Sequence, residues 1–173
     1  MRRLMLLRHS QAERAEPGES DRARVLTERG RTDAAKIGGY MARHAMTPGV
    51  AIVSSAARAQ ETWKLAAAAF QPPPPMQSVE ALYNASPSAL LEVVKQAAAE
   101  SVLIVGHNPG MQDLASLLIA TGDIETRERL REGFPTSGLA VIDFIFDSWA
   151  DLHLHSGRLE RFVSPKWTEA ATN

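Results

Sequence analysis

Four residues with the chemistry to bind and transfer a phosphoryl group each follow a short apolar run of the sequence. Arg8 and His9 stand directly after one run, Arg58 follows a second run, and His107 follows a third. A guanidinium offers a fixed fork of donors for phosphate oxygens, and an imidazole can act as a nucleophile. The three runs are LMLL at residues 4–7, VAIV at residues 50–53 and VLIV at residues 102–105.

These runs predict the elements that must position the four residues. Four consecutive apolar residues are typical of a strand buried on both faces of a parallel sheet. In an open α/β sheet, ligands bind beyond the carboxyl ends of the strands. We therefore expect Arg8, His9, Arg58 and His107 to meet at one edge of the sheet as an anion site. One Arg-His pair at one strand end would be weak evidence, because a solvated strand end explains it equally well.

The segments around Arg58 and His107 strengthen this interpretation. Arg58 lies at the start of a helix predicted for residues 57–70, where Ser54 and Ser55 are expected to act as caps. A cation near a helix N-terminus is unfavourable unless an anion binds there. His107 precedes a helix that we expect Asn108 to cap and Pro109 to begin, so free N–H groups are predicted close to His107.

The order of the elements predicts an α/β fold. We expect a three-layer α/β/α sandwich with a mostly parallel central sheet, an antiparallel edge strand near the C-terminus, and one domain over residues 1–163. The expected segments are a polar loop (11–25), a helix capped by Thr27 (28–45), the strand at 50–53, the helix at 57–70, a proline-rich connector (71–78), a helix with Ser86 as cap and Pro87 as first residue, the strand at 102–105, the helix after Pro109, a charged stretch (121–132), a strand in LAVIDFIF (139–146), a returning antiparallel strand (152–155 and 159–163) and a polar C-terminal tail (164–173).

Composition excludes several classes of protein. The chain has 173 residues, enough for one domain, with 45% apolar and 23% charged residues. A formal net charge of -1 argues against a general nucleic-acid binder. The absence of cysteine excludes disulfides and thiolate metal ligands and fits a reducing compartment. The first apolar run is too short for a signal peptide, and no stretch reaches the length of a membrane span, so we expect a cytoplasmic protein without a membrane partner.

Five segments in the same order resemble the histidine phosphatase superfamily, which has the phosphoglycerate mutase-like fold. Within it, they look like the small phosphohistidine phosphatase (SixA-like) branch, and the similarity runs through nearly the whole chain. The resemblance implies a phosphatase of signal transduction that needs no metal or cofactor. The segments are LMLLRHS (4–10), LTERGR (26–31), SSAARAQET (54–62), GHNPG (106–110) and PTSGLAVIDF (135–144).

The resemblance also implies a role for each site residue. His9 would be the nucleophile that takes the phosphoryl group, while Arg8, Arg58 and a protonated His107 would bind its oxygens. Attack requires an unprotonated nitrogen, so we expect the other nitrogen of His9 to donate to a backbone carbonyl. Ser10 stands where the commonest superfamily motif has glycine, and we expect Ser10 to contribute to substrate binding.

The expected site has two candidates for the proton donor. Better-known relatives use an acidic residue between the second arginine and the second histidine, and Glu80 is the suitably placed carboxylate. Asp21 on the first loop is a weaker candidate, and a solvated role for Glu80 is equally compatible with the sequence. A weak acid matters less for phosphohistidine, because imidazole has a pKa near about 6.5 and leaves readily. This favours phosphohistidine in a protein as the substrate.

Three other functions remain as alternatives. The chain could be a phosphatase for small phosphate esters, a mutase of the same superfamily, or a non-catalytic module that binds a phosphoprotein. A mutase would need a closed pocket and a clear acid, and the sequence indicates neither. A dinucleotide-binding oxidoreductase is excluded because RHSQAER, and not a glycine-rich turn, follows the first strand.

Overall fold

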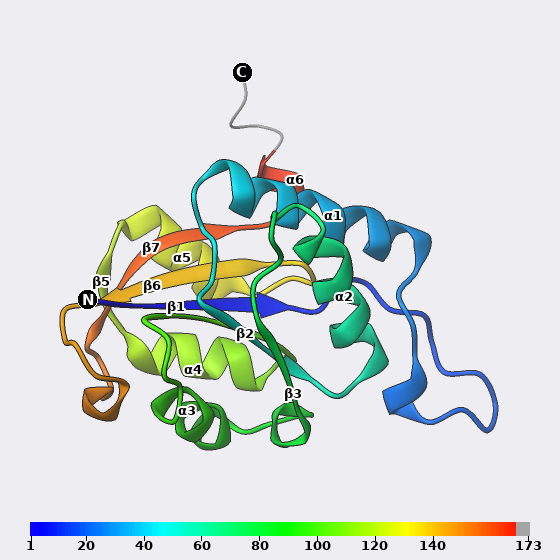
Figure 1. Cartoon of the computed structure of the whole chain (residues 1–173), viewed down its shortest axis with the longest axis horizontal. Helices are drawn as coiled ribbons and strands as arrows, with labels where there is room; N and C mark the ends of the chain where they lie inside the picture. Colours follow the sequence, from blue (N-terminus) through cyan, green and yellow to red (C-terminus); the bar gives the residue numbers. More distant parts are fainter. Residues whose placement is uncertain (169–173) are drawn as a thin grey trace.

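A seven-stranded sheet runs through the middle of the computed structural model, which describes residues 1–168 (Figure 1). The strand order is β3-β2-β4-β1-β6-β7-β5, so β1, the first strand of the chain, is central. The strands are β1 (Arg2–Arg8), β2 (Val50–Ser54), β3 (Met76–Val79), β4 (Ser101–Gly106), β5 (Ile119–Gly122), β6 (Leu139–Phe144) and β7 (Gly157–Val163).

The sheet is mostly parallel, as expected, and β6 is its one antiparallel strand. β6 pairs antiparallel with β1 on one side and with β7 on the other, whereas β1 and β2 both pair parallel with β4. The expectation of an antiparallel strand at the edge is therefore wrong, because the edges are β3 and β5. The apolar run LAVIDF explains the position of β6, since a strand buried on both faces belongs inside a sheet.

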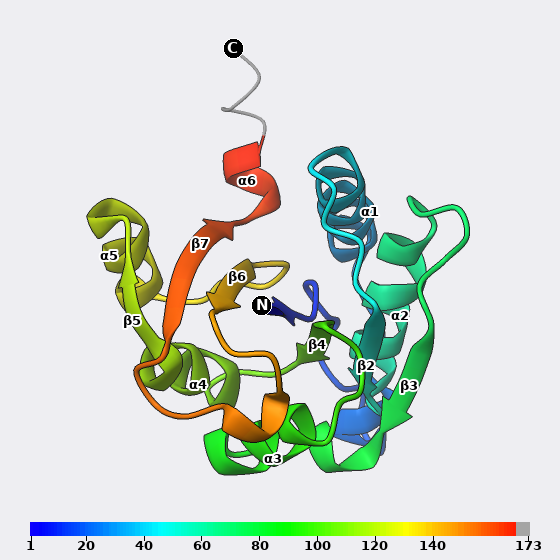
Figure 2. The same cartoon turned by 60° about the vertical axis from the view of Figure 1, so that its left-hand side comes forward.

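Helices cover both faces of the sheet and complete the predicted three layers. Figure 2 shows α1 and α2 on one side of the sheet and α3 and α4 on the other. The helices are α1 (Glu28–Arg43), α2 (Ala57–Ala67), α3 (Pro87–Lys95), α4 (Gly110–Leu118), α5 (Ile124–Glu132) and α6 (Pro165–Thr168). Within residues 1–168, none of these helices is long and apolar enough to cross a membrane.

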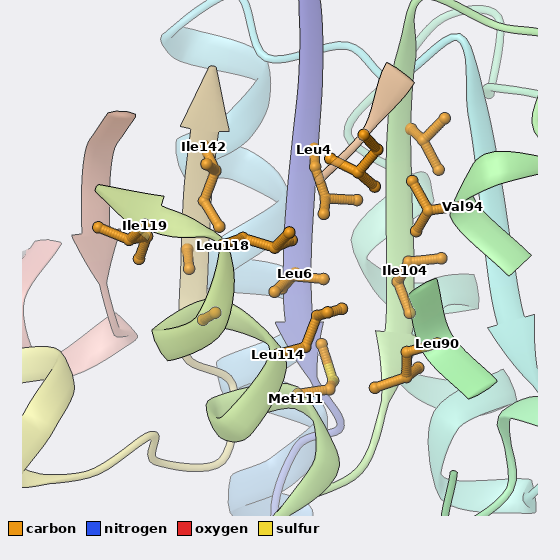
Figure 3. Packing of buried hydrophobic residues seen from close by; sticks show 14 of the residues in the cluster. Leu4, Leu6, Leu90, Val94, Ile104, Met111, Leu114, Leu118, Ile119 and Ile142 are labelled. Carbon is orange, nitrogen blue, oxygen red and sulfur yellow. The ribbon is translucent and has the colours of Figure 1, made fainter. Parts of the chain in front are cut away.

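β1 is buried on both of its faces, as its sequence predicts. Leu4 and Leu6 pack in the cluster that α3 and α4 cover, and Figure 3 shows Leu6 close to Leu114 of α4. Met5 and Leu7 point to the opposite face and pack in the cluster under α1 and α2. Burial of apolar residues on both sides fixes the position of the strand that carries Arg8 and His9.

Three segments differ from the sequence-based expectation. The connector contains the edge strand β3, and the charged stretch forms part of β5 and the helix α5, which Asp123 caps by accepting from the N–H of Thr126. The charged sequence of α5 has no apolar periodicity that would predict a helix, because Leu130 is its one buried residue. Part of the expected tail forms α6, and Trp167 packs edge-on against Phe162 with ring centroids 5.6 Å apart. The remainder of that tail, residues 169–173, lies outside the described residues.

Candidate active site

The four residues singled out by the sequence line one cavity of about 540 Å³. Arg8 ends β1, His9 follows it, Arg58 lies in the first turn of α2, and His107 follows β4. Because β1 and β4 are parallel neighbours, with Arg8 opposite Gly106, the two strand ends bring both histidines to the same edge. The ring centroids of His9 and His107 are 5.3 Å apart.

His9 is held in one tautomer, as expected. Its Nδ1 lies 2.8 Å from the carbonyl oxygen of Ser10, and a carbonyl can only accept, so Nδ1 carries the hydrogen and Nε2 keeps its lone pair. Burial, and then the charges of Arg58 and Arg8, lower the pKa of His9 to about 4. The imidazole is therefore neutral near pH 7 and has an unprotonated nitrogen.

Two buried hydroxyl groups hold the segment around His9 in place. The N–H of Ser10 donates to Oγ1 of Thr62 at 2.9 Å, and Ser10 Oγ lies 2.6 Å from Ser137 Oγ. The N–H of Ser137 donates to the carbonyl oxygen of Arg8 at 3.1 Å. Ser10 is fully buried and is not among the residues that line the cavity, so its expected contact with substrate is not supported.

His107 is also fixed by contacts on both ring nitrogens. Its Nδ1 lies 3.4 Å from Nη2 of Arg58, which can only donate, so Nε2 carries the hydrogen and donates to Ser54 Oγ at 2.7 Å. Burial, His9 and Arg58 lower the pKa of His107 to about 3. Desolvation and a neighbouring cation both oppose a second proton on His107. The expected protonated His107 concerns the site with a phosphoryl group bound and stays a prediction.

The expected helix caps beside these residues also differ. Ala56 is the N-cap of α2, while Ser54 stays in β2 and contacts His107. Pro109 is the N-cap of α4, but Oδ1 of Asn108 still accepts from the N–H of Gln112 in the first turn at 3.3 Å, and Nδ2 of Asn108 donates to the carbonyl oxygen of Phe134 at 3.1 Å. Both side chains that looked like helix caps thus contact parts of the site or its supporting loop.

The two arginines have donors available for an anion. Nη1 of Arg8 donates to the carbonyl oxygen of Phe134 at 2.8 Å, and burial lowers the pKa of Arg8. Arg58 is only 3% exposed. Among residues 1–168, the buried Nε atoms of Arg8 and Arg58 have no hydrogen-bond partner. An unpaired buried donor is unfavourable, and an anion with several oxygens would supply the acceptors that these two Nε donors lack.

The two candidate acids lie in different surroundings. Asp21 lines the cavity, where a hydrogen bond from Tyr83 and the charge of Arg58 lower its pKa to about 2. Glu80 is exposed, pairs with Arg22, and is not among the residues lining the cavity. Ser55 and Arg22 lower the pKa of Glu80, and both carboxylates are therefore ionised near pH 7. The preference for Glu80 over Asp21 as the acid at the site is not supported by this arrangement.

Sequence reasoning missed several residues that shape the site. Tyr83 lines the cavity, and its ring lies edge-on to His107 with the centroids 5.5 Å apart. Ser54, Thr62 and Ser137 lie inside segments that carried the family resemblance, yet nothing in their spacing indicated their hydrogen-bond partners. Their contacts depend on residues more than 50 positions away in the chain.

Comparison with known proteins agrees with this geometry. The model of the histidine phosphatase superfamily (branch 1) matches residues 4–83, which include Arg8, His9 and Arg58. A crystal structure from Agrobacterium tumefaciens, provisionally described as the phosphohistidine phosphatase SixA, is 33% identical with a TM-score of 0.81, covering 95% of this chain and 98% of its own. The chain belongs to the histidine phosphatase superfamily. Within this superfamily it belongs to the SixA-like branch.

Two further relatives span nearly all of this histidine phosphatase. An uncharacterized protein of Mycobacterium tuberculosis is 32% identical over 153 residues, covering 86% of this chain and 94% of its own. A second structure, from Nakamurella multipartita and also provisionally described as SixA, is 25% identical with a TM-score of 0.78, covering 95% of this chain and 96% of its own. Together with the site geometry, these similarities support phosphatase activity for this member of the superfamily.

Proposed function

We propose that this histidine phosphatase hydrolyses phosphohistidine in a protein through a phosphorylated His9. The observation that carries the proposal is the neutral His9, whose Nδ1 donates to the Ser10 carbonyl at 2.8 Å and whose Nε2 is thereby left as the nucleophile. Arg8, Arg58 and His107 line the same cavity as His9. A cytoplasmic phosphoprotein is the proposed partner, in keeping with the cysteine-free sequence.

In the first step, Nε2 of His9 attacks phosphorus and the bond between phosphorus and the substrate nitrogen breaks. The leaving imidazole keeps the bonding electron pair and takes a proton from water. Charge on a phosphoryl group in transfer spreads over its three equatorial oxygens. The guanidiniums of Arg8 and Arg58 are aimed to stabilise that charge, and they supply a positive field without requiring a metal ion. In the second step, water attacks phosphorus, the bond to His9 breaks, and inorganic phosphate leaves.

His107 contributes a proton in this scheme once the phosphoryl group is bound. The Nε2 hydrogen is held by Ser54, so an added proton goes to Nδ1, which faces Arg58. A phosphoryl dianion favours that proton by attraction, in opposition to the burial and cationic neighbours that disfavour it in the empty site. The protonated Nδ1 then donates to a phosphoryl oxygen.

The surroundings of the two carboxylates favour phosphohistidine over phosphate esters. An alkoxide leaving group needs a proton, whereas an imidazole leaving group has a pKa near about 6.5 and is readily protonated in water. Asp21 and Glu80 both have lowered pKa values and are poor proton donors. A site without a ready carboxylic acid therefore suits a phosphoramidate substrate better.

The decisive experiment measures phosphate release by wild type, His9→Ala and His153→Ala with a metal chelator present. His153 is an exposed histidine on the loop before β7 and serves as the matched control. The substrates are a histidine-phosphorylated protein and a generic aryl phosphate. We expect turnover by wild type and His153→Ala, a preference for the phosphoprotein, and no turnover by His9→Ala.

Other outcomes would select an alternative function. Preference for the aryl phosphate would indicate an ester phosphatase, and transfer of the phosphoryl group to a second substrate hydroxyl would indicate a mutase. Binding of the phosphoprotein without release from either substrate would indicate a non-catalytic module. Retained turnover in His9→Ala would overturn the proposed nucleophile.

A further inference from the structure

The carboxylate of Asp21 is an anion held within the candidate phosphoryl site. Nη2 of Arg58 donates to Oδ2 of Asp21 at 3.1 Å, and Nη1 of Arg58 donates to the Asp21 carbonyl oxygen at 2.8 Å. Nε of Arg24 donates to Oδ1 at 3.0 Å, and the Tyr83 hydroxyl donates to Oδ2. These donors keep Asp21 ionised, as its pKa of about 2 reflects.

The contacts of Arg58 leave little room for a second anion. Both hydrogens of Nη2 are engaged, one by the Asp21 carboxylate and one by Nδ1 of His107. Nε remains without a partner among residues 1–168. A phosphoryl group that takes a bidentate contact through Nε and Nη2 must therefore displace Asp21 or His107 from Nη2.

Asp21 is also connected to the opposite side of the cavity. The Arg22 guanidinium lies 4.4 Å from the centroid of the Tyr83 ring and pairs with Glu80. Residues of the first loop are thus linked to the segment after β3, which carries Glu80 and Tyr83. We call Asp21, Arg22, Glu80 and Tyr83 the Asp21 clasp.

We propose that Asp21 is a resident counter-ion of Arg58 that an incoming phosphoryl group displaces, so that Asp21 and Tyr83 set the affinity of the site for phosphoryl anions. This inference rests on the proposed function in one respect, namely that Arg58 binds the phosphoryl group. In the ligand-free protein the carboxylate balances the buried guanidinium charge. In the bound protein it is a like charge beside the phosphate, which weakens binding and favours product release.

A purely structural role for Asp21 predicts the opposite change in phosphate affinity when the carboxylate is removed. If the carboxylate only held Arg58 in its binding conformation, removal of that contact would weaken phosphate binding. If the carboxylate competes with phosphate for Nη2, removal of its charge tightens binding. Asp21→Asn keeps the size of the side chain and an oxygen acceptor, so it separates charge from shape. Tyr83→Phe removes the hydroxyl donor that helps to hold Asp21 and leaves the ring in place.

The experiment measures the dissociation constant of inorganic phosphate by titration calorimetry for wild type, Asp21→Asn, Tyr83→Phe and Glu92→Gln. Glu92 is an exposed carboxylate on α3 and controls for the loss of one negative charge. We expect Asp21→Asn to bind phosphate about tenfold more tightly than wild type, Tyr83→Phe to bind it several-fold more tightly, and Glu92→Gln to match wild type.

The calorimetric readout needs no turnover, so it separates this inference from the proposed function. A protein that binds phosphate more tightly after Asp21→Asn but hydrolyses nothing would support the proposed role of Asp21 as a displaceable counter-ion. It would overturn the proposed phosphatase activity. Thermal unfolding of each variant, with and without phosphate, checks that the fold is retained. Unchanged or weaker phosphate binding in both Asp21→Asn and Tyr83→Phe would overturn the proposed role of Asp21 as a displaceable counter-ion.

Discussion

Nη2 of Arg58 lies 3.4 Å from Nδ1 of His107, so a buried guanidinium and a buried imidazole share one hydrogen bond inside the cavity. This contact requires a neutral His107, because a protonated imidazole has no acceptor nitrogen. The site is thus arranged around uncharged histidines and charged arginines. A bound phosphoryl group would favour the protonated form of His107 but not of His9, since His9 must stay unprotonated to attack.

The lowered histidine pKa values predict how stability depends on pH. The pKa values of His9 and His107 are about 4 and about 3 in the folded protein, compared with 6.5 for the unperturbed group. Between these values the unfolded chain binds more protons, so the free energy of unfolding falls as pH falls from about 6.5 toward 4. The loss is on the order of 3 kcal/mol for each histidine.

Urea unfolding at a series of pH values measures this loss. His107→Gln removes one of the two titrating groups, and we expect its stability to depend less steeply on pH over the same range. His155→Gln, at an exposed position outside the cavity, is the control. Equal slopes for wild type and His107→Gln would contradict the assignment of a lowered pKa to His107.

Ser54 is expected to control the tautomer of His107. Its hydroxyl is fully buried and accepts the Nε2 hydrogen at 2.7 Å, so Ser54→Ala removes the acceptor and frees the other tautomer. We expect kcat/KM to fall by about tenfold, in line with the loss of a partner that orients a site histidine. Steady-state kinetics on the preferred substrate measures the effect, and Ser88→Ala, at an exposed position of α3 outside the cavity, is the control. Similar losses in both serine variants would argue for a general packing effect.

The hydroxyl pair of Ser10 and Ser137 is expected to stabilise the turn that carries His9. Ser10→Ala or Ser137→Ala leaves the other hydroxyl buried without its partner and should lower the free energy of unfolding by about 1 to 3 kcal/mol. The double variant removes both hydroxyls and should lose less than the sum of the two single changes. Denaturant unfolding of the four proteins gives this coupling directly, and strict additivity would show that the hydroxyls do not interact.

Two adjacent glycines in α1 should respond in opposite ways to alanine. A Cβ added to Gly38 would lie 2.3 Å from the carbonyl oxygen of Ala66 in α2, too close for the helices to stay in place. A Cβ at Gly39 would meet only Nη1 of Arg43, at 3.2 Å on a flexible side chain. We expect Gly38→Ala to destabilise the protein by about 2 kcal/mol or more through overpacking. Gly39→Ala should be neutral or stabilising by up to about 1 kcal/mol, through helix propensity.

Thermal and denaturant unfolding of both glycine variants test this difference. The two changes add the same methyl group to the same helix, so helix propensity cancels in the comparison. Equal stabilities would show that α1 and α2 separate without penalty. The contact explains why a residue with poor helix propensity occupies the middle of α1.

The central part of the site was predictable because it depends on strand ends. Apolar runs before Arg8, Arg58 and His107 placed them at the same edge of a parallel sheet, and the structure has them in one cavity. The expected tautomer of His9 is also confirmed. It was predictable because the acceptor is the backbone carbonyl of the next residue in the chain. Local sequence determines both features.

The remainder depends on contacts between distant segments. The sequence favoured Glu80 over Asp21 as the candidate acid, yet the path of a non-periodic loop brings Asp21 to Arg58 while Glu80 pairs with Arg22. Ser54 has the residue type of a helix cap, yet its partner is 53 positions away. The helix α5 escaped notice because a single buried residue, Leu130, leaves it almost without an apolar face.

The central position of β1 has a consequence for synthesis of the protein on the ribosome. Leu4 pairs with Val102 of β4 and with Ile142 of β6, so β1 acquires its second neighbour only after a segment more than 130 residues further along the chain has been made. Contacts between such distant residues close late and slowly. A nascent chain that stops before β6 therefore carries both arginines and both histidines but leaves one side of β1 unpaired. The growing polypeptide therefore gains the complete support for its nucleophile only after β6 has been made.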